Sequence, residues 1–501
     1  MKKILFCLAF AALSFALIGC THTHTPADPV RENEVSADCT REGSCESVVY
    51  CADCGEELSR TPVVLPRLEH LWENGTCTDC HAGLPALSLS DDGTHYVVVG
   101  GEENNRASIA IPQTYNGFPV REIASAAFLD CTALESLIIP EGVSEIGSDA
   151  FRGCSALTAV SLPDSVRTLG ERAFLDCSSL VSVDISLGMT KIERNMFVRC
   201  SALKEVNIPV GVTEIGENAF SGCESLASIR LPDGVRTIGE YAFTGCHLLA
   251  TVRIPEGVTE IGKGAFMDCR TLGGLRLPRS VTSIGSYAFY NCIMLVDIQI
   301  PALVSEIGEY TFTHCYKLTD VTLSPGIKTI GDYAFTNCTK LTRVTLPDGL
   351  TSIGTCAFSL CTSLENLAIP DGVVEIGQQA FNNCSSLKAA HLPDSVTKIG
   401  GGAFSGCRSL ESVTLPNGLT SIGYCAFMGC SLQSIVIPDT VTVIEHNTFS
   451  GCEKLKSVTL PDGLTSIGEH AFMNCTSLES IVIPDSVVEI ADNAFDNCPA
   501  A

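Results

Sequence analysis

Four cysteines near the start of the chain have the residue type and spacing of a metal site. They form two C-x-x-C pairs, Cys51 with Cys54 and Cys77 with Cys80, and 22 residues separate the pairs. Two such pairs place four thiolates around one tetrahedral Zn²⁺, although this separation is slightly longer than usual. Four sulfur ligands leave no open position for water, so the sequence predicts a zinc ion with a structural role.

The same segment permits a different chemistry. Cys39 and Cys45 precede the two pairs, and six cysteines in an oxidising compartment form three disulfides by any of fifteen pairings. His70 and His81 are substitute zinc ligands, but four cysteines already fill the shell. We predict zinc on the two C-x-x-C pairs, with Cys39 and Cys45 either bridged to each other or free. Residues 39–83 are called the cysteine module.

The other residues with catalytic potential do not converge. Histidines stand singly at different positions of a 23-residue repeat, at His247, His314, His391, His446 and His470. The chain has no phosphate-binding loop, no G-x-S-x-G motif and no H-E-x-x-H motif. The sequence therefore predicts a protein that is not an enzyme.

The N-terminus has the features of an export signal. Lys2 and Lys3 precede the largely apolar residues 4–19, and Cys20 follows directly. This apolar run is shorter than the ~20 residues that span a membrane, so it predicts a signal peptide that is removed. The residues before Cys20 resemble a bacterial lipobox. This resemblance implies that Cys20 becomes the lipid-bearing N-terminus, while an ordinary signal peptide with a chance cysteine is the alternative.

We expect residues 20–38 to form a polar tether. The protein is then exported and anchored by lipid to the bacterial outer membrane or cell surface. Its formal charge of −26 opposes binding to nucleic acid or to anionic lipid surfaces. Membrane contact is therefore expected through the N-terminal lipid alone.

A 23-residue repeat organises most of the chain. Its marker is a phenylalanine followed three residues later by a cysteine, and one interval has 22 residues instead of 23. The marker phenylalanines are Phe128, Phe151, Phe174, Phe197, Phe220, Phe243, Phe266, Phe289, Phe312, Phe335, Phe358, Phe381, Phe404, Phe427, Phe449, Phe472 and Phe495. A period of 20 to 29 residues with leucines spaced L-x-x-L-x-L is typical of leucine-rich repeats. Each repeat is therefore expected to be one coil of a solenoid.

The coil from Cys407 to Phe427 illustrates the expected local structure. Leu410, Val413 and Leu415 point inward from a strand that ends at Pro416, because proline has no N–H to donate to a sheet. A single coil cannot bury its apolar face alone, so neighbouring coils stack. The sequence predicts a parallel β-sheet on the concave face and short turns or 3₁₀ segments on the convex face.

The repeat cysteines form one file along the solenoid. Strands lie about 4.8 Å apart, so neighbouring thiols approach disulfide range. However, the seventeen cysteines of this file are an odd number that cannot pair completely. We predict buried, reduced thiols that cap backbone carbonyls of the next turn.

The repeat resembles a known family. With I-P or L-P after the strand and I-G-x-x-A-F-x-x-C at the end of the coil, it is similar to the Treponema pallidum-type leucine-rich repeats of BspA-like surface proteins. The resemblance covers residues 94–498. We assign residues 84–127 to an N-terminal cap and first coil, and residues 128–501 to the array. The cysteine module resembles the small zinc-ribbon-like modules that precede such repeats in bacterial surface proteins.

Two functions fit this architecture. The resemblance implies a surface or envelope lipoprotein that binds a protein or glycan partner, in adhesion to a host or to other bacteria. The alternative is a passive structural spacer or scaffold of the cell envelope. Clusters of charge or aromatic residues at variable repeat positions distinguish the two, because a spacer has no need of them.

Three arginines provide such a cluster. Arg230, Arg253 and Arg276, called the arginine strip, stand ten residues after successive marker phenylalanines, where the strand points outward. Like charges on adjacent strands repel, and guanidinium groups suit carboxylates and sulfates. The strip therefore predicts docking of an acidic partner, and Arg343 lies in the companion file eight residues after the phenylalanine. The alternative is local neutralisation by carboxylates of that companion file, namely Glu205, Asp297 and Asp320.

A second cluster is aromatic. Tyr287, Tyr310 and Tyr333, called the tyrosine file, stand two residues before the marker phenylalanine, where other coils carry polar residues. Exposed tyrosines are enriched in binding surfaces, which makes this file a second candidate site. Stacking for stability alone is the alternative.

The last strand, predicted at residues 478–483, has no successor in the sequence. An unpaired strand edge recruits other strands. We therefore expect self-association through this C-terminal edge.

Overall fold

The computed structural model describes residues 25–35, 37, 43–65, 72–73, 76–77 and 81–499. The chain divides into two compact units, residues 1–82 and residues 83–501. Several predicted features lie outside the described residues: the signal peptide, the lipid site Cys20, and the side chains of Cys39, His70 and Cys80.

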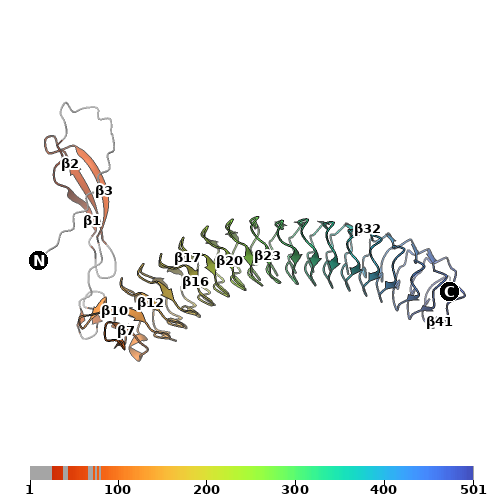
Figure 1. Cartoon of the computed structure of the whole chain (residues 1–501), viewed down its shortest axis with the longest axis horizontal. Coiled ribbons are helices and arrows are strands. Elements are labelled where there is room, and N and C mark those ends of the chain that lie inside the picture. Colours follow the sequence, from red (N-terminus) through yellow and green to blue (C-terminus); the bar gives the residue numbers. More distant parts are fainter. Residues whose placement is uncertain are drawn as a thin grey trace. The chain divides into compact units, whose positions relative to one another are not determined.

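The first unit contains a small antiparallel sheet (Figure 1). Strands β1 (Val30–Val35), β2 (Gly43–Tyr50) and β3 (Glu57–Leu65) lie in that order, and β4 (Trp72–Glu73) pairs with β5 (Thr76–Cys77). The expected tether thus includes a strand, because β1 pairs with β2. The sequence of this strand, VRENEV, is largely polar because most of its side chains are exposed, so it shows no pattern that predicts a strand.

Arg60 on β3 joins the three strands of this sheet. Its guanidinium contacts Glu32 of β1 at 3.1 Å, Glu46 of β2 at 2.5 Å and Glu57 of its own strand at 2.8 Å. Ion pairs between exposed groups contribute little singly, but a network on one guanidinium holds its partners in a defined geometry. The polar faces of β1 to β3 are therefore ordered around one cation.

The second unit begins with strands that close its first coil. These are β6 (Leu87–Leu89), β7 (Tyr96–Val98), β8 (Ser108–Ala110), β9 (Thr114–Tyr115) and β10 (Phe118–Ile123), with the 3₁₀ helix η1 (Glu102–Asn104) after β7. Asn104 is fully buried and its amide nitrogen donates to the carbonyl oxygens of Val99 at 2.8 Å and Ala127 at 2.7 Å. Its side-chain oxygen accepts the Ala86 amide at 2.7 Å. Asn104 therefore satisfies backbone groups where no preceding coil exists within this unit.

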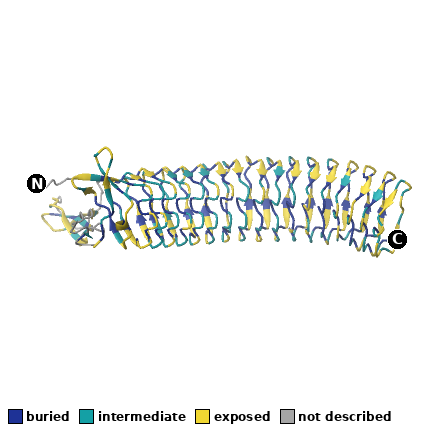
Figure 2. Ribbon diagram, turned by 90° about the horizontal axis from the view of Figure 1, so that it is seen from below, coloured by how far each residue is buried: buried dark blue, intermediate teal, exposed yellow. Residues whose placement is uncertain are grey.

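Two series of short parallel strands, called ladder A and ladder B, run along the coils (Figure 2), and each series is divided into several sheets. Ladder A is made of strands at the predicted strand position. Each of these strands has three residues, except the strand of the last coil, which has two. Its strands are β8, β11 (Ser136–Ile138), β13 (Ala159–Ser161), β15 (Ser182–Asp184), β17 (Glu205–Asn207), β19 (Ser228–Arg230), β21 (Thr251–Arg253), β24 (Asp297–Gln299), β26 (Asp320–Thr322), β28 (Arg343–Thr345), β30 (Asn366–Ala368), β32 (Ala389–His391), β34 (Ser412–Thr414), β36 (Ser434–Val436), β38 (Ser457–Thr459) and β40 (Ser480–Ile481). Each pairing joins equivalent residues of successive coils, such as Val183 with Val206. The predicted parallel sheet is confirmed.

Ladder B begins with β7 and β10. It continues as two-residue strands, each of which follows the turn after the ladder A position of its coil. Its strands are β12 (Glu145–Ile146), β14 (Thr168–Leu169), β16 (Lys191–Ile192), β18 (Glu214–Ile215), β20 (Thr237–Ile238), β22 (Glu260–Ile261), β23 (Ser283–Ile284), β25 (Glu306–Ile307), β27 (Thr329–Ile330), β29 (Ser352–Ile353), β31 (Glu375–Ile376), β33 (Lys398–Ile399), β35 (Ser421–Ile422), β37 (Val443–Ile444), β39 (Ser466–Ile467) and β41 (Glu489–Ile490). The sequence predicts turns or 3₁₀ segments away from ladder A. The structure has turns there together with this second sheet, and η1 is the only 3₁₀ helix in the described part of the chain.

The third side of each coil is the turn around the marker phenylalanine. In one coil the amides of Tyr310, Phe312 and His314 all donate to carbonyls of the following coil, at 2.9, 2.8 and 2.9 Å. Tyr310 and His314 have left-handed backbone, with φ of 56° and 63°. Left-handed residues on both sides of the phenylalanine let alternate amides point the same way. This side is thereby hydrogen-bonded from coil to coil without being a strand.

The marker phenylalanines form one stack through the core. Neighbouring ring centroids lie 5.1 to 5.7 Å apart from Phe128 to Phe495. All except Phe495 are fully buried. From Cys154 onward, the repeat cysteine beside each ring donates its thiol to the phenylalanine carbonyl of the preceding coil, as Cys315 does to Phe289 at 3.2 Å. The predicted carbonyl cap is therefore present, but toward the coil before and not the coil after.

The glycine of the I-G motif is required by close approach between coils. A Cβ on Gly423 would lie 2.5 Å from the amide nitrogen of Gly401, and one on Gly285 would lie 2.4 Å from that of Lys263. Real Cβ atoms do not come so near to backbone, so a side chain at either of these two positions would require the local backbone to shift. Glycine therefore permits the close stacking of these coils, whereas Glu193, Glu445 and Ala491 stand at the same position in other coils.

Some side chains pair with the equivalent residue of the neighbouring coil. Arg172 forms a bidentate ion pair with Asp149, at 2.9 and 2.8 Å, and Arg199 forms one with Asp176, at 2.6 Å for both contacts. Each pair joins positions that lie 23 residues apart in one file. Charged side chains at variable repeat positions therefore link particular coils.

Candidate binding surfaces

The two predicted zinc-binding pairs begin with the same backbone turn. The Cys51 amide donates to the carbonyl of Glu56 at 2.7 Å, and the amide of Gly55 donates back to the Cys51 carbonyl at 2.9 Å. The Cys77 amide donates to the carbonyl of Ala82 at 2.9 Å, and His81 donates back to Cys77 at 3.0 Å. The fourth residue after each first cysteine has left-handed backbone. Both pairs thus start from one kind of tight turn.

The burial of these cysteines differs. Cys51 and Cys77 are buried, and Cys54 is exposed, as is the substitute ligand His81. Cys80 lies outside the described residues. The described residues by themselves contain no group of three or more His, Cys, Asp or Glu arranged for a metal. The zinc site remains a prediction.

The arginine strip lies on the outward side of ladder A. Arg230 and Arg253 are paired residues on β19 and β21, and all three arginines are exposed. Arg253 forms an ion pair with Asp233 at 3.1 Å, and both side chains keep more than half of their exposure. Within the described part of the chain, Arg230 and Arg276 have no ion pair. The strip is therefore accessible and only partly neutralised.

The expected neutralising carboxylates are not the partners of these arginines. Asp297 and Asp320 are adjacent in ladder A, and Asp320 pairs in register with Arg343, but no ion pair joins them. Glu205 lies on β17 and likewise has no ion pair among the described residues. Arg343 is exposed on β28. Asp233, from the turn after ladder A, is instead the residue that contacts the strip.

Ladder A is interrupted beside the strip. In the coil that contains Arg276, only a single bridge remains, between Thr251 and Gly274. Gly273 and Gly274 stand where neighbouring coils carry side chains, and a Cβ on Gly274 would meet no atom within 4 Å. Sequence reasoning missed the exposed Arg279 in the next turn. The sequence does indicate this residue, because Arg279 is positively charged at the repeat position where the two preceding coils carry the acidic residues Asp233 and Glu256.

The tyrosine file is a continuous stack on the turn side. The rings of Tyr287 and Tyr310 lie 4.7 Å apart and those of Tyr310 and Tyr333 lie 4.6 Å apart, nearly parallel. Lys263 covers the outer face of Tyr287, with Nζ 5.9 Å from the ring centroid. All three tyrosines are half-buried. A stack of this kind offers ring edges and hydroxyls to solvent, and not ring faces.

Further aromatic residues lie beside this stack. Tyr290 and His314 are in edge-to-face contact at 5.4 Å, and Tyr316 follows at 5.6 Å. His314 Nδ1 accepts from Asn337 at 3.0 Å and lies 3.2 Å from the Tyr316 hydroxyl. Desolvation lowers the pKa of His314 below its ordinary value, so the ring is neutral at neutral pH. Sequence reasoning missed this cluster because its members occupy different repeat positions.

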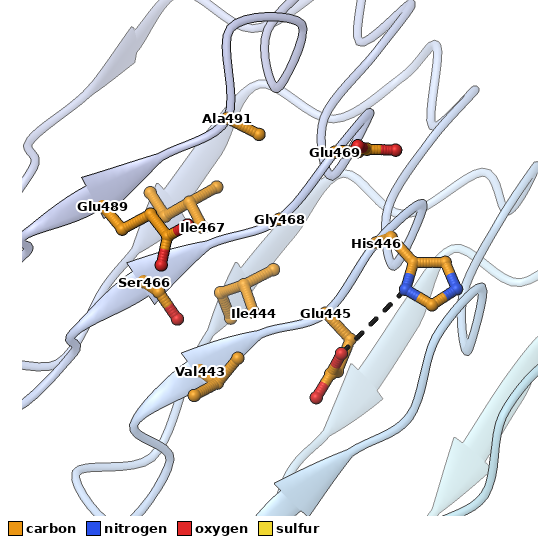
Figure 3. A pocket seen from close by; sticks show the side chains of 10 residues that line it. All are labelled: Val443, Ile444, Glu445, His446, Ser466, Ile467, Gly468, Glu469, Glu489 and Ala491. Carbon is orange, nitrogen blue, oxygen red and sulfur yellow. Dashed lines mark ion pairs between the residues drawn. The ribbon is translucent and has the colours of Figure 1, made fainter.

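The pocket in Figure 3 lies over the last strands of ladder B. It has a volume of about 460 Å³ and is lined by strands β37, β39 and β41 with the residues after them. Its ionisable side chains are Glu445, His446, Glu469 and Glu489, and His446 lies 4.0 Å from Glu445. Figure 3 shows these groups pointing in different directions from successive coils. They do not form a catalytic arrangement.

Among the described residues, no helix is long and apolar enough to cross a membrane. In the last described coil, Val482 and Val488 are 81 % and 86 % exposed.

Comparison with known proteins identifies the repeat. A family model described as "BspA type Leucine rich repeat region (6 copies)" matches residues 121–250, 190–319, 305–429 and 376–501. No curated protein matches the chain. Leucine-rich-repeat solenoids of this type are typical of binding proteins that are not enzymes.

The chain is also similar to solved structures of bacterial proteins. A leucine-rich repeat protein from Bacteroides ovatus is 28 % identical, with a TM-score of 0.58, and the match covers 80 % of this chain and 93 % of that one. A leucine rich cell surface protein from Faecalibacterium prausnitzii is 27 % identical, with a TM-score of 0.35, and the match covers 86 % and 98 %. The leucine rich repeat protein of T. pallidum is 23 % identical, with a TM-score of 0.23, and the match covers 51 % and 87 %.

The overlapping matches to the family model together span residues 121–501, which is the whole two-ladder array from its first marker phenylalanine to its last. This family consists of leucine-rich-repeat surface proteins that typically mediate protein interactions. The chain belongs to the BspA type leucine rich repeat family.

Proposed function

We propose that the protein is a surface or envelope lipoprotein that binds a partner carrying clustered carboxylate or sulfate groups through the arginine strip. The partner is a protein or glycan of a host or of another bacterium. The observation that carries this proposal is the exposure of Arg230, Arg253 and Arg276 on consecutive coils, where Arg253 alone has an ion pair with another described residue.

The electrostatic state of the strip supports a binding role over a passive spacer. Adjacent guanidiniums on paired strands repel each other, and Arg230 and Arg253 are such a pair. Threonine occupies the same position in later coils, at Thr322 and Thr345, and causes no repulsion. An acidic ligand would relieve the repulsion and satisfy planar donors that suit bidentate contacts. A spacer gains nothing from this arrangement.

The tyrosine file is the second candidate surface. Its rings are stacked, and desolvation raises the pKa of Tyr310 above its ordinary value. The Tyr310 phenol is therefore protonated at neutral pH and can donate a hydrogen bond. The covered ring faces disfavour stacking on a sugar ring, so this surface suits polar contacts with a protein.

Lipid attachment at Cys20 and zinc in the cysteine module belong to the same proposal. The lipid would tether the solenoid to the outer membrane or cell surface. Zinc would hold the cysteine module through Cys51, Cys54, Cys77 and Cys80, supported by the matching turns at Cys51 and Cys77. Incorporation of labelled fatty acid into the wild-type protein, and its loss in Cys20→Ser, tests the anchor.

Binding to immobilised poly-glutamate and to heparin tests the arginine strip. The triple variant Arg230→Thr, Arg253→Thr, Arg276→Thr should bind more weakly, and its binding should depend less on salt. Its matched control is Lys317→Thr, Lys340→Thr, Lys454→Thr, which removes three exposed positive charges from another file. If both variants lose binding equally, net charge and not the strip is responsible. If neither loses binding, the tyrosine file becomes the candidate.

A further inference from the structure

Two exposed aliphatic side chains lie on adjacent coils just before the arginine strip. Leu187 and Val210 are 66 % and 85 % exposed. They stand thirteen residues after the marker phenylalanine, where the two coils before them and the two coils after them carry exposed carboxylates. Isolated aliphatic residues are common on protein surfaces, but here two successive coils carry one in place of a charge. The replaced file is otherwise acidic on both sides, with Glu141, Asp164, Asp233 and Glu256.

Hydrogen bonds fix the turn that carries Leu187. Its amide donates to Asp164 Oδ1 at 3.0 Å. The preceding residue, Ser186, is buried, and its hydroxyl donates to the carbonyl of Val166 at 2.8 Å. The leucine is therefore held toward solvent by a defined backbone, so little conformational freedom is lost when a partner covers it.

The coil of Val210 exposes further apolar surface. Val206 and Ile208 of this coil are half-buried, whereas the equivalent residues of the coils on both sides are buried. Ladder A changes from one sheet to the next at this point, since β17 is the edge strand of one sheet and β19 of another. Leu187, Val206, Ile208 and Val210 together are called the aliphatic patch.

The aliphatic patch adjoins the arginine strip. The guanidinium of Arg253 reaches the carboxylate of Asp233, which lies one coil earlier, at 3.1 Å. Val210 stands in the same repeat relation to Arg230 as Asp233 does to Arg253. An arginine side chain of the strip thus spans the distance to this file, where Arg230 meets an aliphatic position and Arg253 a carboxylate.

The two ends of this surface have opposite charge. Beside the aliphatic patch, Asp164 and Asp184 are exposed carboxylates, and at the far end of the strip Arg276 and Arg279 are exposed arginines. An acidic ligand is repelled at the first end and attracted at the second. Its acidic part therefore lies on the strip, and whatever covers the aliphatic patch is uncharged.

The surface has the length of a short extended peptide. The coils of Leu187 and Arg276 are four repeats apart, or about 19 Å at the spacing of adjacent strands. An extended chain covers this distance with about six residues. Protein interfaces combine a buried apolar centre with charged residues at the rim, whereas a sulfated glycan has no aliphatic side chains to bury on the patch.

We propose that the aliphatic patch and the arginine strip form one docking surface for an acidic protein segment that carries large apolar side chains at one end. The inference rests on the proposed function and selects a protein over a glycan as the partner of the strip. The carboxylates of the segment contact the arginines, and this contribution is screened by salt. The apolar end is buried on the aliphatic patch, and this contribution depends on the apolar area removed from water.

Two capped peptides of equal charge test this surface. One has the sequence Leu-Gly-Leu-Gly followed by four glutamates, and the other has serine in place of both leucines. In calorimetric titrations of the full chain at low salt, the parent should bind the leucine peptide about tenfold more tightly than the serine peptide. The variant Leu187→Ser, Val210→Ser should lose this preference and keep the parent's affinity for the serine peptide.

A matched control removes two other exposed aliphatic side chains. Val374 and Val436 are 51 % and 66 % exposed in coils remote from the strip. Val374→Ser, Val436→Ser should therefore keep the tenfold preference. A loss of preference in this control as large as in Leu187→Ser, Val210→Ser would overturn the assignment of the aliphatic patch.

A photocrosslink locates the two ends of the peptide. A benzophenone amino acid in place of the first leucine should label residues 187–211. The same amino acid placed after the last glutamate should label residues 253–279. Exchange of the two labelled regions, or labelling outside both, would overturn the proposed orientation and with it the docking surface.

The outcomes separate this inference from the proposed function. Equal affinity of the parent for the two peptides, or a preference that survives Leu187→Ser, Val210→Ser, overturns the docking surface. The strip itself still stands in that case if its arginine-to-threonine variant loses poly-glutamate binding, and heparin binding lost in the same variant then identifies a glycan partner. A leucine peptide that binds the arginine-to-threonine variant as tightly as the parent overturns both.

Discussion

The thiol of Cys338 donates a hydrogen bond to the carbonyl oxygen of Phe312 across 3.2 Å and so joins its coil to the one before. The same contact recurs in coil after coil, as in Cys361 to Phe335 and Cys384 to Phe358. These thiols are fully buried, and desolvation raises their pKa above the ordinary value of a cysteine. A protonated donor is thus built into every interface between coils.

Alkaline pH should unfold the solenoid through these thiols. Burial raises the pKa of Cys315, Cys361, Cys407 and Cys452 to about 12, while an unfolded thiol ionises near 8.5. Below pH 8.5 both states hold the proton. Above it only the unfolded state loses protons, so stability falls as the pH rises toward 12. Four thiols give a slope of roughly 5 kcal/mol per pH unit.

Urea unfolding at several pH values above 8 measures this slope. The double variant Cys361→Ala, Cys407→Ala removes two of the four thiols and should reduce the slope by about half of that contribution. An unfolding free energy that stays constant up to pH 11 would contradict the prediction.

Asn104 should control the stability of the N-terminal end. Asn104→Ala removes two hydrogen bonds to buried carbonyls and one from a backbone amide, at a cost of about 3 kcal/mol. Hydrogen exchange in β7 and β10 should accelerate first, because repeat arrays open locally. Asn105→Ala is the control, since Asn105 is exposed and accepts one bond from the Ala133 amide at 2.8 Å. Equal losses in the two variants would rule out a special role for Asn104.

Leu360→Asn should stabilise the array. Leu360 has a left-handed backbone with φ of 63°, in a file where other coils mostly carry glycine, asparagine or aspartate. Asparagine adopts this conformation more readily than leucine, and Leu360 is 36 % exposed, so the gain is about 1 kcal/mol. Leu129→Asn provides the control, because Leu129 is 42 % exposed with an ordinary backbone. Thermal unfolding that drops equally in both variants would refute the argument.

The cysteine module should hold one zinc ion per chain. Elemental analysis of protein purified without reducing agent should find zinc, and Cys51→Ser or Cys77→Ser should lose it together with the folding of the module. Cys45→Ser should retain zinc, because Cys45 belongs to neither C-x-x-C pair. Zinc-free protein with three disulfides among residues 39–80 would show the competing chemistry instead.

Much of the fold follows from the sequence because the repeat is strict. Val413 and Leu415 alternate before Pro416, and the strand β34 ends at Thr414 as this pattern indicates. Ladder B was not predictable from propensity, since two residues such as Ser421–Ile422 are too short to show a period. They become a strand only because equivalent residues stack on both sides.

The candidate surfaces, too, could be predicted only in part from the sequence. The outward direction of Arg230 follows from strand alternation, whereas its lack of a partner depends on side-chain geometry that no pattern contains. The left-handed backbone at Tyr310 was hidden because tyrosine rarely adopts it. The residue two positions after the phenylalanine is also left-handed and is often glycine or asparagine, as at Gly222 and Asn337. The residue types in that file indicate a left-handed backbone from the sequence.

The ion pairs of Arg172 with Asp149 and of Arg199 with Asp176 have a consequence for how the chain finds its native threading. Coils of nearly identical sequence would also stack if one were skipped and looped out, since phenylalanine would still meet phenylalanine. If the coil that carries the partner carboxylate were skipped, Arg199 would face Gly153 and Arg172 would face Ala126 in place of a carboxylate. The ion pairs at irregular positions of the array therefore favour stacking of each coil on its native neighbour over stacking on another coil.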